Sequence, residues 1–315
     1  MTKVEKSART IFKDCLNVKP HESLHIVAEE TLSGMADVLW KRARMATKFA
    51  QITIFSHQFS NYLGLPPSIY NSLGNSDCVV ILSPKIISER LFEAARQKGT
   101  RLLLLGNARQ DLFDHLLKIN LNKVATASRR LADIFSIGRN LVLTSPSGTD
   151  LKINLVKTKG RAITGIAKET GQLTTLPAGE ACVTLSNNVD GEVVLDRICG
   201  QTRALNKAII LKIKNGVITQ VKGAHEAEQL RKAIRKYGTA GRKINELGIG
   251  TNDQVSFGNS QLGDEKVFGT AHIAIGEYQI TKVHGKIIQA TKGVILKPTV
   301  CIDGRVILKD GSVLV

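Results

Sequence analysis

In roughly the first 130 residues, short apolar runs alternate with amphipathic helical segments, and this alternation constrains the fold more than any other feature. The runs at 77–83 (DCVVILS) and 101–106 (RLLLLG) are strand-like, and the segment between them, 88–99, is helical and ends at a glycine. Strand, helix and strand repeated in this way predict a parallel sheet covered on both faces. We therefore expect a Rossmann-like α/β domain over residues 1–137.

The pattern of residues changes near residue 140, from alternating strands and helices to strands joined by turns. The segment 140–156 (NLVLTSPSGTDLKINLV) has the pattern of two strands joined by a Ser/Pro/Gly turn. The tail 299–315 carries Asp303-Gly304 and Asp310-Gly311, which are strong turn signals between alternating strands. The sequence thus predicts an α/β N-terminal domain with a parallel sheet, followed by a β-rich α+β C-terminal domain over 138–315 that carries the functional site.

Composition narrows the class of protein. Of the 315 residues 43% are hydrophobic and 23% are charged, as in an ordinary globular protein. There is no apolar run of the roughly 18 residues that a membrane span needs, and the start of the chain lacks a signal-peptide core. The five cysteines are scattered and form no C-x-x-C pair. We expect a cytoplasmic protein with reduced cysteines and no membrane partner.

The net charge of +17 raises the question of a nucleic-acid partner. The densest basic segment, 230–243 (LRKAIRKYGTAGRK), reads as an amphipathic helix with a solvated basic face. Aromatic residues make up only 4% of the chain, and the only one among these lysines and arginines, Tyr237, falls on the apolar side of the helix. Single-strand binders need such aromatic side chains for stacking. We therefore expect no nucleic-acid partner, and the charge itself is left without an explanation.

Several familiar motifs fail on inspection. The run GIGTND at 248–253 has Asp253 where a dinucleotide loop needs glycine, and HEAEQ at 225–229 has Gln229 where a zinc-protease helix needs histidine. The sequence contains neither a phosphate-binding G-x-x-x-x-G-K-[ST] loop nor a G-x-S-x-G nucleophile elbow. Nucleotide chemistry and serine hydrolysis thereby lose their support.

Three titratable residues of the second half stand in unusual contexts. Glu180 ends the turn TTLPAGE, Glu246 precedes a Gly-rich turn in ELGIGTN, and His272 lies in an apolar strand, AHIAIG, seven residues after Glu265. Each has an ordinary alternative: a solvated turn carboxylate, a helix-end charge, and a core histidine bonded to a carbonyl. Together they offer the oxygen and nitrogen ligands that zinc, cobalt or iron accept.

Five ordered segments resemble the aminopeptidase T, or leucyl aminopeptidase, family of metallopeptidases. They are TTLPAGE, GVITQVKGAHEAEQLRK, INELGIGTN, DEKVFGTAHIAIG and GVILKPTVCIDGRVILKDG. The resemblance implies a homodimer whose C-terminal domain binds two divalent metals (Zn, Co, Mn or Fe), with Glu180, Glu246 and His272 as ligands. It also implies that Tyr278 steadies the oxyanion of peptide hydrolysis. A ring-cleaving dioxygenase branch resembles the same scaffold and uses one iron.

The chain departs from the family pattern at one motif. Where the family carries H-x-D-G, this sequence has Ala290 and Lys292, so two metal ligands are missing. A lysine ammonium beside two dications would be repelled by several kcal/mol from each, at an effective dielectric of about 20. An ordinary two-metal site therefore requires that Lys292 point outward.

Three outcomes remain open. In the first, His284 or another side chain replaces a lost ligand and one metal survives. In the second, Lys292 neutralises Glu180 and Glu246 in a metal-free pocket. In the third, Lys292 is the catalytic residue, as a base or a Schiff-base nucleophile.

The main functional hypothesis is an aminopeptidase T-like metal-dependent hydrolase with altered or lost activity. The alternatives are a non-catalytic relative that binds a peptide or small molecule, and a metal-dependent ring-cleaving dioxygenase. A lysine within hydrogen-bonding reach of Glu180 or Glu246 would end the hydrolase hypothesis.

Overall fold

A computed structural model describes residues 2–56, 69–71, 74–83, 89–106, 110–258, 260–276 and 290–315. Contacts divide the chain into two compact units. The first comprises Met1–Asn122 and Ile163–Ala178, and the second comprises Lys123–Ala162 and Gly179–Val315. Among the described residues, no helix is both long and apolar enough to cross a membrane.

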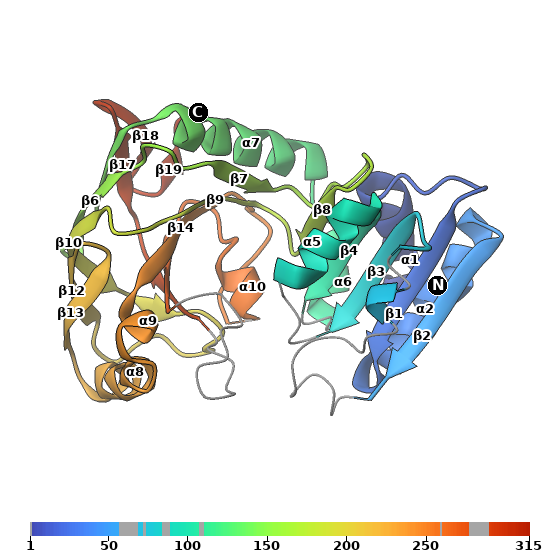
Figure 1. The fold of residues 1–315 in the computed structure, drawn as a ribbon, viewed down its shortest axis with the longest axis horizontal. Helices are drawn as coiled ribbons and strands as arrows, with labels where there is room; N and C mark the ends of the chain where they lie inside the picture. The colour runs from blue at the N-terminus through green and yellow to red at the C-terminus, as the bar shows by residue number, and fades with distance from the viewer. Residues whose placement is uncertain are drawn as a thin grey trace. The chain divides into compact units, whose positions relative to one another are not determined.

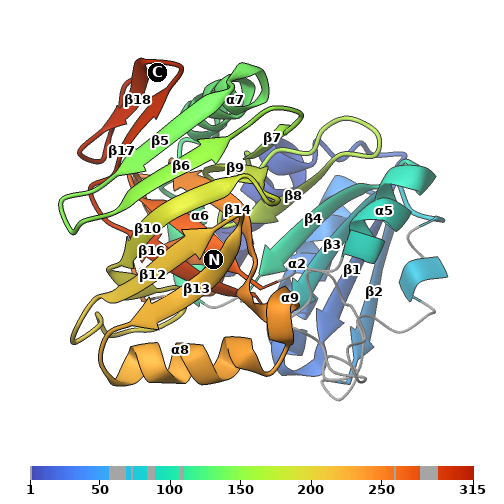
Figure 2. The same cartoon turned by 60° about the vertical axis from the view of Figure 1, so that its left-hand side comes forward.

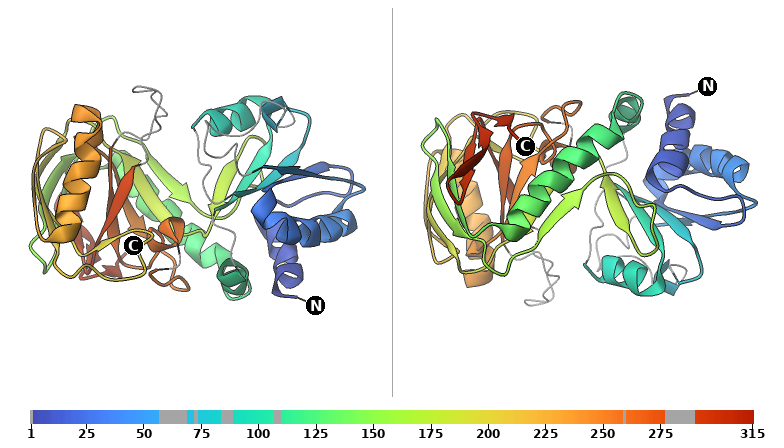
Figure 3. Two further views of the ribbon diagram at one scale, coloured as in Figure 1. Left: turned by 90° about the horizontal axis from the view of Figure 1, so that it is seen from below. Right: turned by 90° about the horizontal axis from the view of Figure 1, so that it is seen from above.

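The first unit is built on a five-stranded parallel sheet in the order β2-β1-β3-β4-β8 (Figure 1). Its strands are β1 (Ser23–Glu29), β2 (Phe49–Phe55), β3 (Cys78–Ser83), β4 (Arg101–Gly106) and β8 (Leu173–Leu176). Its helical segments are α1 (Lys3–Arg9), a π-helical turn (Thr10–Cys15), a 3-10 turn (Glu30–Leu32), α2 (Ser33–Ala46), α5 (Glu89–Lys98) and α6 (Gln110–Leu116). Figure 3 shows α5 on one face of the sheet and α1 and α2 on the other. Because both faces are covered, every residue of β3 and β4 is buried, which explains their uninterrupted apolar sequences.

Within its described residues, the second unit contains two sheets and four helices. The eight-stranded sheet, in the order β13-β12-β10-β6-β5-β17-β18-β19, is formed by β5 (Asn140–Thr144), β6 (Asp150–Asn154), β10 (Val189–Leu195), β12 (Ile209–Lys214), β13 (Val217–Lys222), β17 (Thr299–Ile302), β18 (Arg305–Lys309) and β19 (Ser312–Val313). The six-stranded sheet, in the order β11-β16-β15-β14-β9-β7, is formed by β7 (Gly160–Ile163), β9 (Glu180–Thr184), β11 (Arg197–Ile198), β14 (Ile244–Gly250), β15 (Ala271–Ile275) and β16 (Thr291–Ile295). The helices are α7 (Leu121–Ile137), α8 (His225–Arg235), α9 (Gly238–Arg242) and α10 (Gln261–Asp264).

Apolar side chains of both sheets form one core in the second unit. In β5 and β6 buried and exposed residues alternate, so that sheet turns one face to the core and the other to solvent. In β15 every residue is buried, so the six-stranded sheet is covered on both faces. Helix α8 lies beside β12 and β13 (Figure 2) and buries Leu230 and Ile234, whereas its Lys232 and Arg235 are exposed.

The predicted fold class is confirmed: a parallel α/β region is followed by an antiparallel β-rich region. The predicted turns are also present, since β5 pairs with β6 and β17 pairs with β18 in antiparallel fashion.

The division into units differs from the expected boundary at 137/138. Most of α7 belongs to the second unit, because it buries Leu131, Ala132 and Phe135 in that core. The chain then returns to the first unit, where Leu173 of β8 pairs with Leu102 of β4. A four-residue strand with the sequence LTTL has no distinctive periodicity, so its distant partner could not be read from the sequence.

Candidate functional site

The six-stranded sheet brings four titratable side chains to one face. Glu180, Glu246, His272 and Lys292 lie on β9, β14, β15 and β16, which are neighbours in that sheet. Ala274 of β15 is paired with both Glu246 and Lys292, so these three residues form one row across the sheet. Opposed residues of antiparallel strands project to the same face. The backbone register therefore directs these groups to a common point.

The next row has no side chain at its centre. Gly248 of β14 is paired with Cys182 on one side and with His272 on the other. A Cβ atom on Gly248 would lie 2.3 Å from Cε1 and 2.4 Å from Nε2 of His272, and 2.7 Å from Oε1 of Glu180. Glycine at this position is thus what allows the imidazole and the carboxylate to meet over the sheet.

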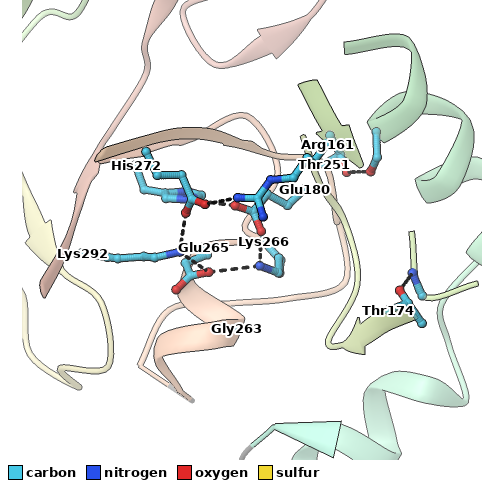
Figure 4. Close-up of polar contacts among 12 residues, drawn as sticks. Arg161, Thr174, Glu180, Thr251, Gly263, Glu265, Lys266, His272 and Lys292 are labelled. Atoms are coloured by element: carbon cyan, nitrogen blue, oxygen red, sulfur yellow. Dashed lines mark hydrogen bonds and ion pairs between the residues drawn. The ribbon is translucent and has the colours of Figure 1, made fainter. Parts of the chain in front are cut away.

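Two further residues complete the cluster from the loop that follows α10. Glu265 and Lys266 are each 1% exposed. The Lys266 ammonium donates to Oε2 of Glu180 and, over 3.1 Å, to Oε2 of Glu265. The Lys292 ammonium lies 2.7 Å from Oε1 of Glu246 and 3.1 Å from Oε2 of Glu265. Figure 4 shows the two lysines approaching Glu265 from opposite sides.

Glu246 is held by cations at both oxygens. Its Oε1 accepts from Lys292, and its Oε2 accepts from Arg161 over 2.7 Å. The Arg161 side chain is about half exposed, so this contact lies at the edge of the cluster. Nε2 of His272 is 4.0 Å from Oε1 of Glu246. Glu246 is therefore close to the imidazole but already satisfied by two side chains.

The charges balance within the cluster. The carboxylates of Glu180, Glu246 and Glu265 face three cations, Lys266, Lys292 and Arg161. Unpaired carboxylates are very costly to bury, and so are unpaired ammonium groups. The lysines thus compensate acidic groups that the fold could not otherwise bury.

The electrostatic environment keeps these groups charged. Burial by itself would raise the pKa of Glu180, but the charges of Lys266 and His272 outweigh it and hold that pKa well below its usual range. Burial is likewise outweighed at Glu265, whose pKa is lowered by Lys292 and Lys266. The same carboxylates raise the pKa of Lys266 despite its burial.

Three buried ligand atoms have no hydrogen-bond partner outside the group that they form. They are Oε1 of Glu180, Oε1 of Glu265 and Nε2 of His272. Glu180 Oε1 and His272 Nε2 face each other at 2.9 Å, and one ligand atom from each of the three residues lies within 4.8 Å of the others. Buried polar atoms are normally paired. Two carboxylates and an imidazole are ligands that a single zinc or iron ion accepts, so this donor set fits one such ion.

The three ligands expected from the sequence lie together, each in a context different from its ordinary alternative. Glu180 is 2% and Glu246 8% exposed, so neither is a solvated turn or helix-end charge. His272 faces the carboxylate of Glu180 with Nε2 and is therefore not a core histidine bonded to a backbone carbonyl. The side chain of Lys292 points into the cluster, and Tyr278 and His284 lie outside the described residues.

Sequence reasoning missed Glu265, Lys266 and Arg161. The first two follow a four-residue helix in a segment without strand or helix periodicity, and 86 positions separate Lys266 from Glu180. The available signal was the pair Glu265-Lys266 itself, placed just before a strand that is apolar except for His272.

Comparison with known proteins finds solved structures that share the fold of this chain. A solved structure of 2,5-dihydroxypyridine dioxygenase from Pseudomonas putida KT2440 matches with a TM-score of 0.86 at 17% identity, over 100% of this chain and 98% of that one. AmpT from Thermus thermophilus matches with a TM-score of 0.68 at 15% identity, over 99% of each chain. At these identities the structural matches establish a shared fold. No curated protein sequence matches the chain.

The family assignment comes from the sequence model of the NicX family, described as 2,5-dihydroxypyridine 5,6-dioxygenase, which matches residues 39–315. The resemblance to aminopeptidase T is thus confirmed at the level of the scaffold and corrected at the level of the family. The chain belongs to the NicX family.

Proposed function

We propose that this protein is a metal-dependent dioxygenase that opens a hydroxylated, nitrogen-containing aromatic ring, with one divalent metal held by Glu180, Glu265 and His272. The observation that carries the proposal is the convergence, within 4.8 Å, of one buried ligand atom from each of these residues. The substrate class follows from family membership, since the matching family model is described as a dihydroxypyridine dioxygenase.

The protein's own contribution is to hold the ligands in place. Lys266 binds Oε2 of Glu180, and both Lys266 and Lys292 bind Oε2 of Glu265. The Oε1 atoms of both carboxylates are thereby left without a lysine partner. Outer groups of this kind orient ligands and tune the site. Three protein ligands leave coordination positions open, and a bound redox-active metal supplies there a place where dioxygen and the ring can be activated together.

The peptidase hypothesis is not carried forward. It required Glu246 as a ligand in a two-metal site, and Glu246 instead accepts from Lys292 and Arg161. The condition that ends the hydrolase hypothesis, a lysine bonded to Glu180 or Glu246, is met at both carboxylates.

The test is metal content followed by turnover. Purified protein reconstituted anaerobically with Fe²⁺ or Mn²⁺ should retain about one ion per chain, and Glu265→Gln and His272→Gln should each lower that occupancy strongly. Glu228→Gln, on the exposed face of α8, serves as the control and should leave it unchanged. The loaded protein should consume oxygen as the absorbance of 2,5-dihydroxypyridine disappears. Retention of metal without oxygen uptake on hydroxypyridines would refute the ring-cleaving activity.

A second candidate is a non-catalytic member of the family that binds a small molecule. The observation in its favour is the charge balance, because three carboxylates already face three cations without any metal. The same measurement separates the two candidates. Wild-type protein that stays metal-free at millimolar Fe²⁺ and Mn²⁺ would favour the non-catalytic candidate.

A further inference from the structure

The ammonium group of Lys292 is enclosed by carboxylates in the way a cation would be. It lies 2.7 Å from Oε1 of Glu246 and 3.1 Å from Oε2 of Glu265, and the residue is 4% exposed. The two acidic residues come from different elements, β14 and the loop after α10, and converge on this one group. Carboxylate oxygens gathered in a buried place are the usual ligands of divalent cations.

The position of residue 292 on its strand allows the ammonium group to be removed by a single substitution. Lys292 is the second residue of β16 and is paired with Ala274, whose methyl group leaves room between Lys292 and Glu246. A shorter side chain at 292 would keep the direction set by the strand and withdraw from the space that the ammonium fills. Oε1 of Glu246 and Oε2 of Glu265 would then lose the cation that they share, while Arg161 stays bonded to Glu246 and Lys266 to Glu265.

We infer that Glu246 and Glu265 form a second cation site, and that the ammonium of Lys292 occupies it in place of a divalent ion. This inference rests on the proposed function only in assigning the first ion to Glu180, Glu265 and His272. It predicts that the wild type binds no more than one ion, and that an acidic residue at position 292 raises the number of ions bound by one.

The experiment compares wild-type protein with Lys292→Asp after dialysis against Mn²⁺, by elemental analysis and by calorimetric titration. The expected result is one ion per chain in the wild type and two in the variant. The control is Lys309→Asp, which makes the same charge change on an exposed position of the other sheet and should bind as the wild type does. A folded Lys292→Asp protein that binds no more Mn²⁺ than the wild type would overturn the inference, as would a wild type that binds two ions.

The two proposals fail in different ways. A wild type without metal together with a variant that binds one ion would refute the proposed function and support the second cation site. If Lys292→Asp does not fold, Lys292→Met decides: it should lose thermal stability and recover several degrees of its melting temperature on addition of Mn²⁺, because a ligand that binds only the folded state stabilises it. Loss of stability that Mn²⁺ does not reverse would contradict the inference.

Discussion

Central strands of the parallel sheet in the first unit and of the six-stranded sheet in the second are equally buried but carry different chemistry. Every residue of β3 and of β15 is buried. Strands β3 and β4 are almost wholly apolar, and Arg101 lies at the first position of β4, where it is bonded to Glu22 and to the carbonyl of Leu16. The six-stranded sheet places charged side chains in mid-strand, where they converge on a common point.

This contrast separates what the fold needs from what the site needs. Strands β3 and β4 demonstrate that covered strands of this protein can be built almost wholly from aliphatic residues. Buried ion pairs contribute little net stability compared with apolar groups of the same size. Six buried ionisable residues, four on this sheet face and two on the loop after α10, are therefore best explained by a function of that face.

The largest expected effect concerns the buried Lys266. Lys266→Met should destabilise the protein by about 3–5 kcal/mol, because it leaves the buried carboxylate of Glu180 without a lysine partner and Glu265 with Lys292 alone. Arg101→Met should cost less, about 1–3 kcal/mol, since its partner Glu22 is 18% exposed and can be rehydrated. Urea unfolding measures both. Equal losses of stability in Lys266→Met and Arg101→Met would contradict the contrast between the two sheets. Partial recovery of stability in the double variant Glu180→Gln/Lys266→Met would support it.

The next effect tests the glycine under the site. Gly248→Ala should cost about 1–3 kcal/mol and lower metal occupancy, since the new Cβ would overlap the His272 ring. Gly34→Ala in α2 is the matched control, because no atom lies within 4 Å of its Cβ position. Its stability should be unchanged or higher by up to about 1 kcal/mol. A tolerant Gly248→Ala with normal metal content would contradict the close packing of Glu180 and His272.

A smaller effect appears on acidification. The pKa of Glu180 and of Glu265 is lowered from the ordinary 4.5, so each contributes stability that is present above pH 4.5 and lost as the pH falls through the folded value. Lys266, whose pKa is raised, contributes below its ordinary 10.5 and loses that contribution as the pH rises.

One pH unit below 4.5, each of these two carboxyl groups should have lost about 1 kcal/mol of its contribution to the free energy of unfolding. Urea midpoints at pH 7 and about pH 3.5 should therefore fall further for the wild type than for Glu180→Gln/Lys266→Met. An identical fall in both proteins would assign acid sensitivity to other groups.

The smallest effects are expected at exposed ion pairs. Asp37 with Lys41 in α2 and Glu228 with Lys232 in α8 have the same i,i+4 spacing, and all four side chains are about half exposed or more. Lys41→Ala and Lys232→Ala should each change stability by no more than about 0.5 kcal/mol. Thermal unfolding of the two variants checks this. A large cost in only one would mean that the two units differ by more than buried charge.

Much of the site could be anticipated because its signals are local. Gly179 has a φ of 108°, and β9 begins at Glu180, as the turn TTLPAGE predicts. The strand around His272 was evident from its small and β-branched residues. The identity of the family was harder, because motifs shared by two branches of one scaffold do not separate a peptidase from a dioxygenase.

The sequence by itself determined that an α/β half is followed by a β-rich half. It also determined where Glu180, Glu246 and His272 stand in the second half. It could do so because periodicity and turn residues act over a few positions. Only the tertiary structure decided that Lys266 and Lys292 are the partners of those groups, and that 163–178 returns to the first sheet. Those contacts join residues far apart in the chain, and their pairing depends on sheet register and burial, which no local pattern encodes.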